Sequence, residues 1–360
     1  MSKRLLIILI IFVAASGTVF LARKFDRPVS SPPLPTREFV DQMVGDHKLQ
    51  VKGPKDVEII LTGDIMLSRN VAMAIKKAGN PDLPFLKLAD FLNSSDFNFG
   101  NLESPFSGRN NITPSGSMVF NAPTNNIKGL VDNNFKILSL ANNHALDQGI
   151  KGLNFTREHL AESGIASVGA GNNQDEAWQG EVVEVRGIKI GFLAASYASQ
   201  NDGGKGKNAY VARTDDFETL KSKVLNLKSQ ADIVIVSMHA GTEYALQPNT
   251  AQTDFAHAAI DAGADVVVGH HPHWVQGYEK YGNGIIFYSL GNFIFDQEWS
   301  QKTKEGLAVK IKISDSKLQS AELFPIIIEN YCCARLMTEK EKTGFMKDYD
   351  LATSTIWLLP

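Results

Sequence analysis

Cysteine is almost absent from this chain. The 360 residues include two cysteines, Cys332 and Cys333, and the two are adjacent. Neighbouring cysteines rarely bond to each other, because a bond between them is strained, so the sequence predicts no disulfide framework. Neither cysteine has a histidine close to it in the sequence, which argues against a zinc site or a cysteine nucleophile here.

Other signatures of chemistry and of partners are also missing. No G-x-S-x-G nucleophile elbow occurs, and the glycine-containing run 203–208 is too short for a phosphate-binding loop and lacks its Ser or Thr. The net charge is −3, and five of the Lys and Arg residues fall within the first 27 positions. A nucleic-acid partner requires a basic face, so nucleic acid is not an expected partner.

One long apolar run stands at the N-terminus. Residues 5–22 are uncharged and mostly apolar, which corresponds to about 27 Å of helix and is enough to span a bilayer. We expect residues 1–27 to be an uncleaved signal anchor that places the domain outside the cytoplasm. The alternative is a cleaved signal peptide, which would release a secreted or periplasmic protein. Four prolines between positions 28 and 35 then predict a linker over 28–56.

From residue 57 onward, candidate strands alternate with candidate helices. Strands are predicted at 57–62, 97–99, 135–141, 232–238, 266–268, 285–289, 307–313 and 318–328, with a hairpin over 181–186 and 188–195. Helices are predicted at 70–79, 85–94, 124–133, 150–163, 216–230 and 251–262. This alternation is typical of an α/β fold. We assign a domain to 57–330 and a C-terminal extension to 331–360.

The stretch 265–274, DVVVGHHPHW, contains the densest cluster of histidines. A β-branched strand stops at a glycine, and His271 and His273 follow on either side of Pro272. Proline stiffens this turn, and neutral imidazole is the commonest protein metal ligand. On its own, the pair is equally compatible with a metal site and with a loop that caps a strand. His270 is predicted to point away from the pair.

Polar residues also follow the other predicted strands. In α/β sheets, ligand sites lie beyond the carboxyl ends of the strands, so these residues are expected to meet although they are far apart in sequence. Oxygen and nitrogen donors of this mixture suit Zn, Mn or Fe. The residues at these strand ends are Asp64, Asn101, Glu103, Asn143, His144, His239, His271 and His273.

Several motifs together resemble a known family. They are GDIMLSR, GNLESPFSG, SLANNHALDQG, VGAGNN with a following EA, HAGTEY, GADVVVGHHPHWVQGYE and YSLGNFIFD, and they occur in order over about 57–297. They resemble the CapA family of poly-γ-glutamate capsule synthesis proteins, whose domain is similar to calcineurin-like metallophosphatases. The resemblance implies a four-layer α/β/β/α sandwich, metallophosphatase-like, with two divalent metal ions.

The resemblance also implies a role for each matching residue. It places Asp64 and His273 on the first metal, Asn143, His239 and His271 on the second, and Glu103 between both. His144 would be the general acid, oriented by Asp147. Metallophosphatases normally carry a histidine two residues after the first aspartate, where this chain has Met66, so the first metal is expected to have one ligand fewer.

Three further residues are candidates around this site. Arg69 could bind a carboxylate or phosphate of the substrate with two hydrogen bonds, and a surface arginine at a helix start is the alternative. Asn292 could line the site as a substrate contact, or serve only as a turn residue. Glu243 is a candidate acceptor for the second ring N–H of His239, because metal-bound histidines commonly need one.

The expected function follows from this resemblance. We expect a membrane-anchored, extracytoplasmic protein that helps make, export or anchor an anionic polymer such as poly-γ-glutamate, beside subunits of a membrane polymer synthase. Its metal site would hydrolyse or transfer amide or phosphoester groups. The alternatives are a non-catalytic polymer-binding or assembly subunit and a periplasmic metallophosphoesterase.

Overall fold

The computed structural model describes residues 56–197 and 209–358. Its strands are β1 Asp56–Ile65, β2 Phe97–Leu102, β3 Phe135–Ser139, β4 Ala166–Val168, β5 Glu181–Val185, β6 Ile188–Ser196, β7 Ile233–His239, β8 Val266–His270, β9 Tyr278–Tyr281, β10 Gly284–Phe287, β11 Asn292–Ile294, β12 Glu305–Ser314, β13 Lys317–Glu329, β14 Cys333–Leu336 and β15 Thr355–Trp357. The α-helices are α2 Arg69–Ala78, α3 Ala89–Leu92, α4 Ile127–Asp132, α5 Gly149–Glu162, α6 Gln174–Ala177, α7 Phe217–Lys228, α8 Thr250–Asp261, α9 Gln301–Lys304 and α10 Glu339–Asp348, with 3₁₀ turns η1 Leu83–Phe85 and η2 Thr124–Asn126.

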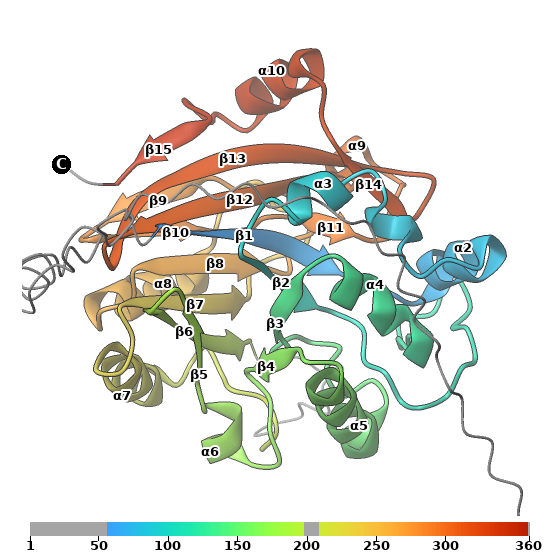
Figure 1. Ribbon diagram of the computed structural model, residues 1–360, viewed down its shortest axis with the longest axis horizontal. Helices are drawn as coiled ribbons and strands as arrows, with labels where there is room; N and C mark the ends of the chain where they lie inside the picture. Colours follow the sequence, from blue (N-terminus) through green and yellow to red (C-terminus); the bar gives the residue numbers. More distant parts are fainter. Residues whose placement is uncertain (1–55, 198–208, 359–360) are drawn as a thin grey trace, which may run out of the picture. The chain divides into compact units, whose positions relative to one another are not determined.

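These strands form two sheets (Figure 1). The larger sheet has the order β14-β13-β12-β1-β2-β3-β4, with β11 paired to β1 and β15 to β13. The smaller sheet has the order β5-β6-β7-β8-β10-β9. Strands β1 to β4 are mutually parallel, as are β6, β7, β8 and β10. The carboxyl ends of several strands in each sheet therefore lie at one edge.

The two sheets pack face to face around an apolar core. Phe99 of β2 stacks on Phe192 of β6 with ring centroids 5.3 Å apart. Alternate residues of the smaller sheet divide between two cores: Ile233 and Ile235 face the larger sheet, and Val234 and Val236 face the helices. The period-two alternation of a strand explains this division.

Helices cover the outer faces of both sheets. On the smaller sheet, Leu220 and Val224 of α7 join Phe255 of α8 in the second core. On the larger sheet, Phe85 of η1 packs against Phe135 of β3 with ring centroids 5.9 Å apart. This arrangement confirms the predicted α/β sandwich of two sheets between helical layers.

Several local predictions differ from the structure. The helix predicted over 85–94 is a 3₁₀ turn, η1, followed by the short helix α3, and the helix over 124–133 begins as the 3₁₀ turn η2. The C-terminal extension predicted at 331–360 supplies β14 and β15, and both pair with β13 of the larger sheet. The predicted anchor and nearly all of the predicted linker lie outside the described residues.

The expectation about the cysteines is wrong. Cys332 and Cys333 are bonded to each other in a disulfide at the start of β14. Asn330 and Tyr331 both have positive φ, which makes a tight turn between β13 and β14. Composition and residue spacing carry no sign of this local geometry.

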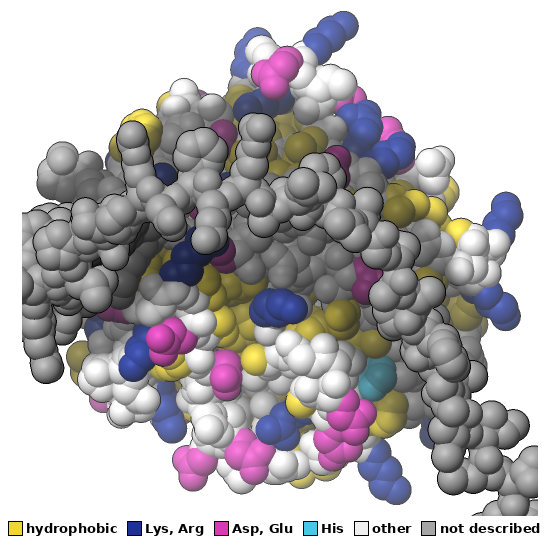
Figure 2. Space-filling model, in the orientation of Figure 1, with side chains coloured by type: hydrophobic (Ala, Val, Ile, Leu, Met, Phe, Trp, Pro, Cys, Tyr) yellow, Lys and Arg dark blue, Asp and Glu magenta, His cyan; other side chains and the backbone are white. Residues whose placement is uncertain are grey.

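The described surface carries both signs of charge. On the face drawn in Figure 2, Lys and Arg side chains are interspersed with Asp and Glu side chains. Among the helices of residues 56–197 and 209–358, none has both the length and the apolar character needed to cross a bilayer.

Candidate metal centre

The carboxyl ends of strands from both sheets bring the predicted ligands together. Asp64 lies in β1, Glu103 follows β2, Asn143 follows β3, His239 ends β7, and the HPH turn follows β8. All of these side chains are buried, with at most 4% of any residue exposed. The predicted convergence therefore exists as a single buried cluster.

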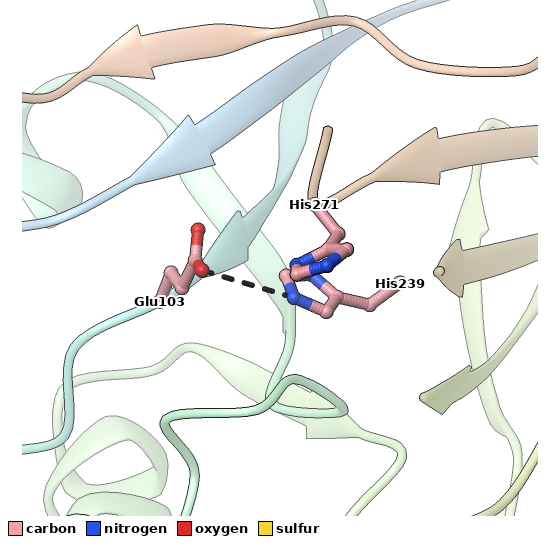
Figure 3. Close-up of side chains that lie close together, drawn as sticks. All are labelled: Glu103, His239 and His271. Carbon is pink, nitrogen blue, oxygen red and sulfur yellow. Dashed lines mark ion pairs between the residues drawn. The ribbon is translucent and has the colours of Figure 1, made fainter. Parts of the chain in front are cut away.

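Glu103 belongs to two groups of possible metal ligands. One group is Glu103, His239 and His271, and the other is Asp64, Glu103 and His273; within each group the donor atoms lie within 4.8 Å of one another. We call Asp64, Glu103 and His273 the first-metal group, and Glu103, His239 and His271 the second-metal group. Figure 3 shows Glu103 facing the two histidines of the second-metal group. A carboxylate common to two adjacent groups has the position of a bridging ligand.

The polar atoms of this cluster suit a cation. Both carboxylate oxygens of Glu103 and Nδ1 of His271 are buried and have no hydrogen-bond partner among the described residues. Buried polar atoms without partners are costly, and an unplaced ion is one of the standard reasons for them. Carboxylate and imidazole donors together match Zn, Mn or Fe, so the residues present fit the implied metal ions.

Burial controls the protonation of these ligands. Desolvation, together with the charges of Asp64, Glu243 and Asp147, raises the pKa of Glu103 well above its ordinary value. Desolvation also lowers the pKa of His239 well below its ordinary value and that of His271 to about 3. The two imidazoles are therefore neutral at pH 7, which is the form that binds a metal.

Asp64 behaves differently from Glu103 although both are fully buried. Desolvation acts to raise the pKa of Asp64, but His270, His273 and Asn101 together hold that pKa below its ordinary value. Its Oδ1 accepts a hydrogen bond from Asn101 Nδ2 at 2.8 Å, and its Oδ2 accepts one from the backbone N–H of His271 at 3.2 Å. Asp64 is thus fixed as a carboxylate before any ion binds.

The backbone of the HPH turn is unusual. His271 and His273 have φ values of 95° and 58°, a region that residues other than glycine seldom adopt. The turn is tied down because Tyr244 N–H donates to the Pro272 carbonyl oxygen at 2.8 Å. Such conformations cluster at functional sites, where surrounding contacts enforce them. Here the strained turn directs both imidazoles toward the carboxylates.

Glycine is required at position 269, directly before His270. A Cβ at Gly269 in β8 would lie 1.9 Å from the carbonyl oxygen of Tyr288, in the segment that follows β10. Only glycine permits this close approach of two backbones.

Amide side chains hold the histidines. His239 Nε2 lies 2.8 Å from Asn143 Oδ1, and His239 Nδ1 lies 3.2 Å from Asn101 Nδ2. His273 Nδ1 lies 2.9 Å from Asn292 Oδ1. In His273 this contact fixes one ring nitrogen and leaves Nε2 in a defined direction, as metal-binding histidines require, whereas both ring nitrogens of His239 have an amide neighbour. Asn101, one of the strand-end donors predicted from the sequence, contacts both His239 and Asp64.

His144 and Asp147 form a buried pair beside the ligands. His144 Nδ1 lies 2.8 Å from Asp147 Oδ2, which also accepts a hydrogen bond from the backbone N–H of Phe120. The Phe120 ring stacks on the imidazole with centroids 4.0 Å apart. The structure therefore brings the predicted acid and its orienting carboxylate together, and it adds Phe120, which the sequence did not indicate.

Arg69 is buried, so the alternative of a surface arginine is wrong. Its Nη2 forms an ion pair with Asp296, its Nη1 donates to the Ser117 carbonyl oxygen at 3.1 Å, and its guanidinium lies over the Phe120 ring. Asp296 is 227 positions away, and no local pattern announced the pairing. Nε is the Arg69 donor without a hydrogen-bond partner among the described residues.

Two predicted contacts look different in the structure. Glu243 is exposed, and the described hydrogen-bond partners of His239 are Asn101 and Asn143. Asn292 is fully buried, and its Nδ2 donates to Gln297 Oε1 and the Thr303 carbonyl oxygen. A role for Glu243 beside His239 and substrate binding by Asn292 stay predictions. The observed contacts of Asn292 are those of a residue that supports His273.

Met66 and His270 complete the surroundings of Asp64. The thioether of Met66 accepts a hydrogen bond from the Ser68 N–H at 3.1 Å, so it is turned to its own backbone. His270, predicted to point away from His271 and His273, places Nδ1 3.4 Å from Asp64 Oδ1. This contact depends on which side of β8 faces β1, which the sequence alone does not show.

The fold and the buried cluster define a two-sheet α/β sandwich with carboxylate and histidine side chains gathered at the ends of its strands. The profile of the bacterial capsule synthesis protein family PGA_cap matches residues 58–297, and the chain belongs to that family.

Two curated relatives agree with this assignment, and one solved structure shares the fold alone. The capsule biosynthesis protein CapA of Bacillus anthracis is 33% identical over 280 residues, which cover 75% of this chain and 67% of that protein. The PGA biosynthesis protein CapA of Bacillus subtilis (strain 168) is 34% identical, over 78% of this chain and 74% of that protein. A hypothetical protein from Thermus thermophilus shares the fold with a TM-score of 0.50 at 16% identity, over 75% of this chain and 98% of that one.

Proposed function

We propose that this protein is a metal-dependent hydrolase or transferase that acts in the synthesis, export or anchoring of a poly-γ-glutamate-type capsule polymer. The observation that carries the proposal is the position of Glu103, whose carboxylate is common to both ligand groups. Family membership supplies the capsule context, and the buried ligand set supplies the chemistry.

Each residue has a defined task in this proposal. Asp64 and His273 would hold the first ion, and His239, His271 and Asn143 the second. Two divalent ions would activate a water molecule and stabilise the attacking and leaving oxygens of a displacement. The substrate classes that fit are phosphoesters and the amide or ester carbonyls of a polymer.

Proton transfer is assigned to His144. Asp147 fixes Nδ1 of this imidazole at 2.8 Å, so Nε2 is left to donate a proton to the leaving group. Phe120 holds the ring from its face. Arg69 would contact the substrate through the guanidinium N–H groups that Asp296 and Ser117 leave free.

The location and partners are part of the same proposal. We assign residues 1–27 to a membrane anchor on the basis of the apolar run 5–22, with the domain outside the cytoplasm. An anionic polymer, the membrane and polymer-synthase subunits are the proposed partners. A cleaved signal peptide with release of the domain is the alternative arrangement.

Metal content tests the proposal first. We expect purified full-length protein to hold about two ions per chain by ICP-MS, and a His271→Ala/His273→Ala double variant to lose them. With Mn, Zn or Fe, wild type should cleave a chromogenic phosphodiester or a γ-glutamyl anilide. His144→Ala should keep its metal and lose turnover by about 10²–10⁴-fold. Absence of turnover with both substrates and all three metals would reject catalysis.

A second candidate is a non-catalytic assembly or polymer-binding subunit. Met66 favours it, because the position that could add a ligand to the first-metal group carries a thioether turned toward Ser68. This candidate predicts that Glu103→Gln and His144→Ala cells still form capsule. Loss of capsule at normal protein levels would count against it and for the enzyme.

A further inference from the structure

His270 is a buried histidine at the end of β8 that faces the larger sheet. In the same strand, Val266 and Val268 belong to the core between the sheets, whereas Val267 belongs to the core under the helices. His270 continues the first of these two sets, because side chains alternate along a strand. Its ring centroid lies 6.4 Å from that of Phe99 on β2, which agrees with this direction.

The imidazole of His270 is buried without hydrogen bonds to the described residues. The residue has 0% exposure, and neither ring nitrogen has a hydrogen-bond partner among the described residues. An aliphatic side chain would fill this core position without leaving polar atoms unpaired. The polar group that His270 does approach is the carboxylate of Asp64, with Nδ1 3.4 Å from Oδ1.

Both oxygens of the Asp64 carboxylate have contacts, and Oδ2 accepts a hydrogen bond from the His271 N–H at 3.2 Å. Asn101 Nδ2 donates to Oδ1, the oxygen that His270 also approaches. The other oxygen, Oδ2, lies 3.6 Å from Nδ1 of His273, another member of the first-metal group. His270 and Asn101 thus occupy the back of the carboxylate, and Oδ2 is directed toward the remaining ligands.

We propose that His270 is a positioning residue for Asp64, which keeps Oδ2 turned into the first-metal group through a contact from Nδ1 to Oδ1. A movement of about 0.4 Å brings the pair within hydrogen-bond distance. The inference rests on the proposed metal centre. It carries weight because the first-metal group has three members and Met66 adds no ligand, so the orientation of Asp64 decides how well an ion is held.

The test measures metal affinity rather than turnover. In a His239→Ala background, which keeps Asp64, Glu103 and His273, Co²⁺ affinity is measured by competition with a chelator and by the absorption spectrum of the bound ion. We expect His270→Leu to weaken binding by about 10–100-fold, the usual effect of losing a partner of a metal ligand. His270→Gln, which keeps a donor, should recover most of the affinity and the spectrum.

A control separates this effect from the loss of any histidine–carboxylate pair. His257 Nε2 lies 3.1 Å from Glu279 Oε2 on the far side of the smaller sheet, so His257→Leu also removes a histidine–carboxylate pair. That variant should bind Co²⁺ like its parent. Equal affinity in His270→Leu and its parent overturns the inference, and so does failure of His270→Gln to recover binding while still folded.

The outcomes also distinguish this inference from the proposed function. Wild type that binds metal without turnover, with weakened binding in His270→Leu, supports the role of His270 and rejects catalysis. If wild type turns over substrate and His270→Leu binds metal as tightly as its parent, the proposed catalysis is supported and the role of His270 is rejected. Wild type that binds no metal overturns both.

Discussion

The two ligand groups of the metal centre are built differently. The second-metal group is Glu103, His239 and His271, and Asn143 lies 2.8 Å from His239 as a fourth donor. The first-metal group is Asp64, Glu103 and His273, and the nearby Met66 directs its sulfur to a backbone amide. One side therefore offers four donors and the other three. If each group holds an ion, as we propose, the second would be held mainly by its ligand number, and the first by the fixed orientation of Asp64.

Removal of the shared ligand is the largest change. Glu103→Gln keeps the shape of the side chain and removes the charge that both groups use. Losing an outer partner of a ligand usually costs about 10–100-fold in metal affinity, so losing a shared ligand should cost more than about 100-fold for each ion. ICP-MS should find almost no metal after dialysis. Glu279→Gln, outside the centre, should retain the wild-type metal content, and two tight ions in Glu103→Gln would refute a bridging role.

Removal of one histidine from each group tests the asymmetry directly. His239→Ala should leave one ion in the first-metal group, and His273→Ala should leave one ion in the second. Because the second group keeps Asn143 as well as Glu103, the ion in His273→Ala should be bound about tenfold more tightly than the ion in His239→Ala, as measured by chelator competition. The reverse order would show that Asp64 outweighs ligand number.

Adding a ligand should reduce the asymmetry. Met66→His supplies an imidazole near Asp64, and we expect the affinity for the first ion to rise about tenfold. Met66→Leu is the matched control, since it preserves a buried apolar side chain without a donor. If Met66→His is folded by circular dichroism and its affinity for the first ion is unchanged, a side chain at position 66 cannot reach the ion.

Much of this centre was predictable because of how α/β sheets end. Asp64, Glu103, His239 and the HPH turn each follow a strand that the alternating pattern revealed, and parallel strands place such ends together. The two-sheet fold was predictable for the same reason, with the family motifs fixing its type.

The contacts behind the ligands were not predictable. Arg69 and Asp296 are 227 positions apart, and their pairing depends on where β11 lies relative to α2. The direction of His270 depends on which side of β8 faces β1, which requires the packing of the two sheets. The same holds for β14 and β15, whose partner strand β13 is known only once the sheet is assembled.

The smallest effect concerns the metal-free protein, at the residue where the two groups meet. Burial raises the pKa of Glu103 above its ordinary value of 4.5, so the folded state keeps a proton that the unfolded state loses. The free energy of unfolding contributed by this group therefore falls as pH rises above about 4.5, by up to about 1.4 kcal/mol per pH unit. Glu103→Gln cannot lose that proton.

Urea unfolding of chelated wild type and Glu103→Gln at several pH values between about 5 and 7 measures this difference. The lowered pKa values of His239 and His271 act in the opposite direction, because they stabilise the folded state as pH rises toward 6.5. Both proteins contain these histidines, so their contribution cancels in the difference between the two free energies of unfolding. The variant should gain stability relative to wild type with rising pH. Parallel profiles would mean that Glu103 is ionised in the folded protein without any metal.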